Sequence, residues 1–196
     1  MTMIASVGPD LPLPLLAATG RYAGALGWDA DRATPQADQW LESRFAPWTR
    51  SILEDWATGA LDHLESVLFS RGDDNAQRLY YYVCELQTRG LIKGPTPLIF
   101  DLARIDRPSS LARTIKSVRK LAALWDVEEV ALETAIADAN RQSIQLPQVP
   151  SGKTCLLAGT APPDRRLHAM IEAAGWMASG DTLSDQWARQ DGHIDV

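Results

Sequence analysis

The sequence is organised around Val67-Leu68-Phe69-Ser70-Arg71-Gly72-Asp73-Asp74-Asn75-Ala76-Gln77-Arg78-Leu79-Tyr80-Tyr81-Tyr82. This stretch begins as a short apolar run, breaks at a Gly-Asp-Asp turn and resumes with apolar residues at helical spacing. Asp73 or Asp74 can cap the helix, because a carboxylate accepts hydrogen bonds from free N–H groups and suits the positive end of the helix dipole. We therefore predict a strand, a tight turn and a helix.

The same alternation extends along the chain. We expect strands near residues 21–26, 66–70, 97–102, 154–158 and 176–179. Helices are expected near residues 11–18, 35–58 (interrupted at Pro47), 73–89, 108–125, 126–142 and 164–174. Residues 1–10 show no periodicity and are expected to be irregular, and the residues after 179 form a polar tail. Strands alternating with helices predict an α/β fold with a parallel sheet flanked by helices.

A Pro- and Gly-containing stretch divides the chain near residue 150. We predict a first α/β domain over residues 1–146, a linker over 147–152 and an incomplete second α/β unit over 153–196. The second unit is too short to bury a core of its own, so it must pack on the first unit or on another chain.

Composition excludes several functional classes. The net charge of −6 argues against a basic nucleic-acid-binding surface, and no apolar run approaches the ~20 residues of a membrane span. The N-terminal residues lack the pattern of a signal peptide, so we expect a cytoplasmic protein. Cys84 and Cys155 are expected to be small buried apolar residues and not ligands.

Five stretches, taken in order, point to a known family. They are Leu15-Leu16-Ala17-Ala18-Thr19-Gly20, Ala46-Pro47-Trp48-Thr49-Arg50-Ser51, Asp73-Asp74-x-x-Gln77-Arg78-Leu79-Tyr80, Phe100-Asp101 and Gly159-Thr160-x-x-Pro163-Asp164-x-Arg166-Leu167-His168. With these motifs the chain resembles the large subunits of the 2-hydroxyacyl-CoA dehydratase and benzoyl-CoA reductase family. The resemblance implies two stacked flavodoxin-type (Rossmann-like) domains, with an iron–sulfur cluster between them held by three cysteines. It also implies radical chemistry on an acyl-CoA thioester, driven by one electron from an ATP-dependent activator.

The chain departs from that pattern where the family binds its cluster. Ala46 stands at the position of the first cysteine ligand and Asp73 at the position of the second, and the third belongs to a part of the second domain that is mostly absent. Cluster irons are held chiefly by thiolates. We therefore expect no cluster, no other metal site and no resident cofactor, and leave a coenzyme A thioester as the candidate ligand.

Two groups of residues are candidate sites. Asp73, Asp74 and Asp101 follow successive strands, where they could act as acid or base or bind a divalent ion, although helix capping explains the first two more simply. The turn with Gly159, Thr160 and Asp164 precedes a helix whose free N–H groups could bind a phosphate of coenzyme A, although an ordinary strand-to-helix turn with Asp164 as its cap explains the pattern without a ligand.

Other motifs are weaker. Ser151-Gly152-Lys153-Thr154 lacks the first glycine of a phosphate-binding loop and precedes its strand. His63, His168 and His193 share no ligand spacing, so surface or capping roles are expected for them.

Three hypotheses follow. The first is a cluster-free accessory subunit whose partner is a second copy of itself or a cluster-bearing subunit of the family, with an acyl-CoA contact. The second is a stand-alone acyl-CoA lyase that uses the three aspartates. The third is one piece of a split subunit that another chain completes, because an open sheet edge is normally covered.

Overall fold

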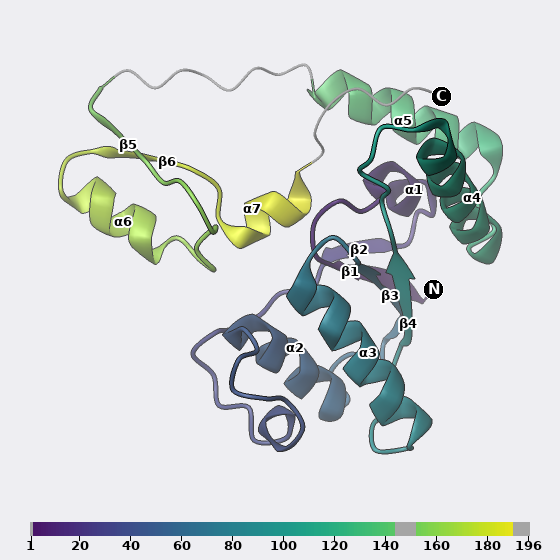
Figure 1. Cartoon of the computed structure of the whole chain (residues 1–196), viewed down its shortest axis with the longest axis horizontal. Coiled ribbons are helices and arrows are strands. Elements are labelled where there is room, and N and C mark those ends of the chain that lie inside the picture. Colours follow the sequence, from purple (N-terminus) through teal and green to yellow (C-terminus); the bar gives the residue numbers. More distant parts are fainter. Residues whose placement is uncertain (1, 144–151, 190–196) are drawn as a thin grey trace.

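The computed structural model describes residues 2–143 and 152–189. Its centre is a sheet of four parallel strands in the order β2-β1-β3-β4 (Figure 1). The strands are β1 (Met3–Val7), β2 (Tyr22–Ala25), β3 (Leu64–Ser70) and β4 (Thr96–Phe100). This is the order of the first four strands of a flavodoxin-type sheet. The predicted α/β fold with a parallel sheet is confirmed.

The N-terminal segment differs from its prediction. Residues 3–7 are not irregular but form β1, which lies between β2 and β3. Ile4 packs into one core, whereas Ala5 and Val7 pack into the other. A strand covered on both faces carries no polar alternation, and five residues are too few for a clear apolar run. Arg21–Leu26 therefore contains the second strand of the chain and not the first.

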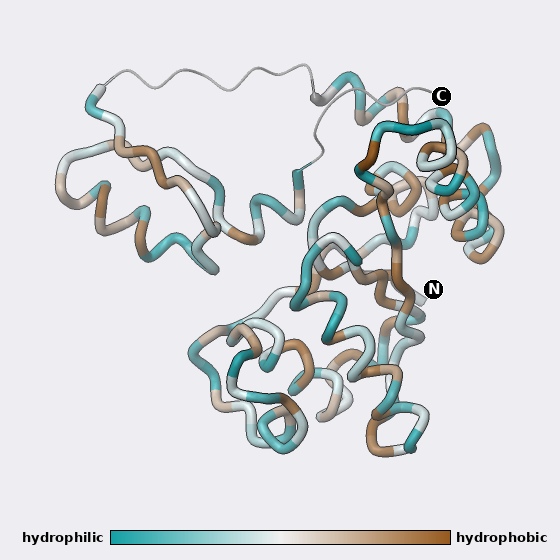
Figure 2. Tube along the Cα trace, viewed as in Figure 1, coloured by the Kyte–Doolittle hydropathy of each residue, from teal (hydrophilic) through white to brown (hydrophobic). Residues whose placement is uncertain are grey.

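Helices cover both faces of this sheet. The helices α2 (Pro47–Ala57) and α3 (Asp74–Thr88) lie over one face. The helices α1 (Leu13–Ala18), α4 (Pro108–Leu124) and α5 (Glu129–Ser143) lie over the other (Figure 1). The core under α2 and α3 is the larger of the two and holds Trp56 and Phe69, whose stacked rings lie 6.0 Å apart. Figure 2 shows hydrophobic segments in the strands of this sheet, and further hydrophobic positions along the helices.

Local signals place the helix ends well. Pro47 is the first residue of α2, and Gly90 follows α3 with φ +70°. The helix expected from residue 35 is wrong apart from one short 3-10 turn, η1 (Ala37–Gln39). The segment around η1 is a loop because the buried carboxylate of Glu54 accepts hydrogen bonds from the backbone N–H groups of Gln36 and Ala37, both at 2.9 Å.

A second, smaller parallel sheet follows in the chain. It pairs β5 (Thr154–Leu156) with β6 (Met177–Ser179), and α6 (Arg166–Ala173) connects them. These two strands and the helix are confirmed predictions. The predicted linker over 147–152 lies outside the described residues except for Gly152.

The last described element returns to the first sheet. A polar tail was predicted after residue 179, but Leu183–Ala188 forms the helix α7. Thr182 and Asp185 form a capping box at its start. The side chain of Trp187 is 2% exposed, and its ring centroid lies 4.6 Å from that of Trp28 and 4.9 Å from that of Trp48. One aromatic residue in a short polar segment gave no periodic signal.

Candidate functional site

The first candidate site lies where β3 and β4 end. Asp73 is the N-cap of α3, and its Oδ1 accepts a hydrogen bond of 2.7 Å from the amide of Ala76. Asp74 is exposed and pairs with Arg78 one helical turn later, at 3.3 Å. Both aspartates therefore have the partners that helix capping and helix pairing require.

Asp101 is held between two arginines. Its Oδ2 accepts hydrogen bonds from Arg71 at 3.0 Å and from Arg113 at 2.6 Å. These guanidinium groups neutralise the carboxylate, which is a poor arrangement for a general base. Across residues 2–143 and 152–189, no three His, Cys, Asp or Glu side chains lie together in a way that could hold a metal ion.

Arginines also line a hollow of about 550 Å³ beside Asp101, between the Gly72 turn and the first turn of α4. Arg104 lies in this hollow and forms an ion pair with Asp10, which follows β1. A Cβ atom on Gly72 would lie 2.9 Å from an oxygen of Asp10, so a side chain at position 72 would displace the Asp10 carboxylate. Guanidinium groups next to a helix N-terminus suit an anionic oxygen. Arg104 and Arg113 already pair with carboxylates, so a phosphate or carboxylate group in the hollow would use their remaining N–H groups in competition with Asp10 and Asp101.

Sequence reasoning missed these arginines. Arg104 and Arg113 lie on either side of Pro108, the first residue of α4. The available signal was a helix that starts soon after a strand and has a basic residue on each side of its first residue.

Ala46 and Asp73, the two positions expected from the resemblance to match cluster ligands, lie at neighbouring helix starts. Ala46 is the N-cap of α2 and Asp73 is the N-cap of α3. The amide of Ala46 donates a hydrogen bond of 3.4 Å to Oδ1 of Asn75, which lies in the first turn of α3. Position 46 offers only a methyl group, and the carboxylate at 73 is engaged as a cap. These residues do not fit an iron–sulfur cluster.

Neither cysteine of the chain lies at these two helix starts. Cys84 lies far along α3 from Asp73 and is half-buried, and burial raises the pKa of its thiol. Cys155 lies in β5 and is also half-buried. A raised pKa disfavours the thiolate that binds metal.

The second candidate site is only partly assembled. Gly159 and Thr160 line a hollow of about 390 Å³ at the carboxyl ends of β5 and β6. Asp164 lines a different hollow of about 560 Å³, next to Trp28 and Asp31. Its carboxylate accepts hydrogen bonds from the amide and the side chain of Arg166, which lower its pKa. Asp164 thus holds the start of α6, although the N-cap residue is Arg165.

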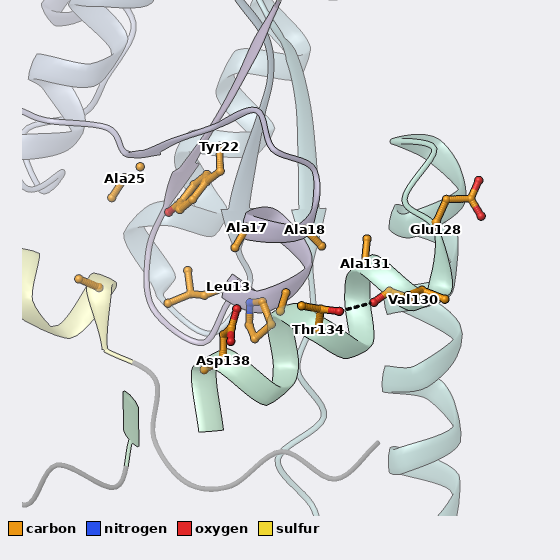
Figure 3. A pocket seen from close by; sticks show the side chains of 15 residues that line it. Leu13, Ala17, Ala18, Tyr22, Ala25, Glu128, Val130, Ala131, Thr134 and Asp138 are labelled. Carbon is orange, nitrogen blue, oxygen red and sulfur yellow. Dashed lines mark hydrogen bonds between the residues drawn. The ribbon is translucent and has the colours of Figure 1, made fainter. Parts of the chain in front are cut away.

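A further hollow, outside both candidate sites, was not expected from the sequence. It has a volume of about 960 Å³ and lies between α1, the edge strand β2 and α5 (Figure 3). Leu13, Ala17, Ala18 and Ala131 make it mainly apolar, and acidic Glu128 and Asp138 lie at its margin. No charged pair or nucleophile converges on it, so it shows no catalytic arrangement.

The histidines differ from one another. His168 was expected at the surface or at a cap, but it is 1% exposed and its Nε2 lies 2.8 Å from the carbonyl oxygen of Gly180. It joins α6 to the loop before α7. His63 is exposed, and His193 lies outside the described residues.

Comparisons with known proteins add no assignment, because no protein-family model and no curated protein matches this chain. Within the described ranges, no helix is long and apolar enough to cross a membrane. The site has to be interpreted from its own geometry.

Proposed function

We propose that this chain is a cluster-free accessory or partner subunit related to the 2-hydroxyacyl-CoA dehydratases and benzoyl-CoA reductases. The observation that supports the proposal is the pair of neighbouring helix starts at Ala46 and Asp73, which the resemblance matches to the family's ligand positions and which carry no thiol. The strand order and the second parallel sheet agree with the domain plan of the family.

The contacts of the aspartates favour an accessory role over a stand-alone lyase. Asp73 is engaged as a helix cap, Asp74 pairs with Arg78 and Asp101 is neutralised by two arginines. A general base needs a free carboxylate within reach of a substrate proton. None of the three offers one.

The arginine-lined hollow is the better place for a phosphate of coenzyme A. The hollow at Gly159 and Thr160 is lined by Asp181 and by no basic side chain, whereas Arg104 and Arg113 line the hollow beside Gly72. A coenzyme A contact would use these guanidinium groups as charge-assisted donors.

Two measurements test the proposal. After anaerobic incubation with ferrous iron and sulfide, the purified protein should retain less than stoichiometric iron and show no broad charge-transfer absorption. Stoichiometric iron with that absorption would overturn the cluster-free assignment.

Calorimetric titration with coenzyme A tests the contact. The double change Arg104→Gln and Arg113→Gln should weaken binding at least about tenfold, since two charge-assisted donors are lost. Thr160→Val tests the other hollow and should leave binding unchanged. Arg44→Gln is the matched control, because Arg44 is exposed and pairs with Glu42 outside both hollows. Equal affinity in the double variant and the control would remove the coenzyme A contact from this hollow.

A further inference from the structure

Among the described residues, the α4–α5 hairpin buries little of its surface apart from Leu121 and the turn residue Trp125. Leu121 is the only buried residue of α4, and none of the described side chains of α5 is buried. A helix on a protein surface normally buries an apolar stripe. Here Leu111 is 63% exposed, Leu124 55% and Val130 72%.

The same hairpin carries two blocks of opposite charge. Residues 102–125 contain six basic residues and one acidic residue, and residues 126–140 contain five acidic residues and no basic one. The first block is strongly positive although the whole chain has a net charge of −6. The second block is negative to the same extent.

Most of these charges find no partner among the residues that the structure describes. Arg104 pairs with Asp10, Arg113 with Asp101 and Arg141 with Asp138. In the part of the chain that the structure describes, the other nine charged side chains of residues 102–140 form no ion pair. They are Asp106, Arg107, Lys116, Arg119, Lys120, Asp126, Glu128, Glu129 and Glu133. Lys116 and Lys120 are one helical turn apart, where like charges repel.

We propose that the hairpin is a self-complementary interface between two copies of this chain. The basic α4 of each copy lies against the acidic α5 of the other, and the exposed apolar side chains around Leu111 and Ile115 are covered between them. A twofold axis makes both charge pairings at once, because the same patch is used on both copies. The inference uses only this hairpin and does not depend on the proposed function.

A second copy fits this surface better than an anionic membrane does. A negatively charged lipid surface would attract α4 but repel the acidic block of α5, which follows directly in the chain. Five unpaired anions next to four unpaired cations match a partner with the same pattern.

Sedimentation velocity of the full chain tests the interface. The wild type should form a dimer over about 10 to 200 µM, and the dimer should weaken as salt rises from about 0.05 to 0.5 M. The double change Lys116→Glu and Lys120→Glu should weaken the dimer at least tenfold, because positions 116 and 120 are then acidic and face the acidic α5 of the other copy. Glu129→Lys with Glu133→Lys should do the same, because positions 129 and 133 are then basic and face the basic α4. Lys93→Glu changes an exposed lysine elsewhere and should have no effect.

Mixing the two double variants decides the geometry. Each should be a folded monomer alone by circular dichroism, and the mixture should form a heterodimer, because the charges are again opposite at both contacts. A single chain with all four changes should dimerise like the wild type. A monomeric wild type, a dimer unaffected by either double change, or a mixture that stays monomeric would overturn the proposal. Binding to phosphatidylserine vesicles without self-association would also overturn it.

Discussion

At the scale of single residues, Asp73 has a role that a substitution can define. Its side chain satisfies the Ala76 amide at the start of α3, where four N–H groups lack helical partners. Asp73→Ala should lower the free energy of unfolding in urea by about 1 kcal/mol. Asp73→Asn should retain most of that stability, since asparagine caps equally well.

Asp74→Ala is the control for this series. Asp74 is exposed and loses only an ion pair one turn apart, so its cost should stay within about 0.5 kcal/mol. If Asp73→Asn preserved stability but abolished turnover of an acyl-CoA, the lyase hypothesis would replace the capping role.

Gly8 is required by a close approach between strand ends. It has φ +97°, and a Cβ atom there would lie 2.7 Å from Cβ of Ser70. Gly8→Ala should therefore cost about 2 to 4 kcal/mol, from the left-handed backbone and the steric overlap together. Gly20→Ala has a similar φ of +63° with open space around it and should cost only about 1 to 2 kcal/mol in the same urea titration. Equal losses would show that the overlap with Ser70 is relieved.

Tyr80 links stability to alkaline pH. Burial, and then the hydrogen bond with Cys84, raise the pKa of Tyr80 from 10.0 to about 12. The unfolded chain releases this proton first, so the contribution is fully present below pH 10 and is lost as pH rises towards 12. Tyr80→Phe should make the unfolding free energy fall less steeply over that interval. An unchanged slope would assign the alkaline loss to other groups, such as Tyr22, whose pKa is also raised by burial.

At the scale of elements, the start of a helix could be predicted where a proline or a capping residue lies at that position in the sequence. Pro47 and Pro108 begin α2 and α4, and Asp73 caps α3, so these starts follow from backbone and side-chain chemistry within a few residues. The strand β1 is different, because its place depends on burial by helices distant in sequence. The strand propensity of a short segment does not depend on that tertiary burial and therefore could not predict β1.

The candidate site, like the secondary-structure elements, could be predicted only in part. Parallel strand ends placed Asp73 and Asp101 at one edge of the sheet, as expected from chain alternation. The arginines that neutralise Asp101 come from the end of β3 and from the second turn of α4. Which charges face each other across such a loop depends on side-chain direction in three dimensions, which a single sequence does not fix.

At the scale of the whole molecule, α7 connects the two sheets. The second unit follows the first by way of residues 144–151, and its own sheet has only two short strands. Trp187 inserts into the core of the first sheet between Trp28 and Trp48, and Arg166 of α6 pairs with Asp31 at 2.8 Å. The Arg166–Asp31 ion pair is exposed and contributes little to stability. The buried Trp187 side chain therefore contributes most to the attachment of the second unit to the first sheet.

Trp187→Ala should therefore cost about 3 to 5 kcal/mol and leave a cavity beside Trp28 and Trp48. Since a two-stranded sheet is marginal alone, amide hydrogen exchange should accelerate in β5, α6 and β6 as well as in α7. Trp176→Ala is the matched control, because Trp176 is 45% exposed and its loss should cost far less. If exchange rises in α7 alone, the second unit holds its fold without this anchor, and its stability must come from the contacts of buried His168 with the loop before α7.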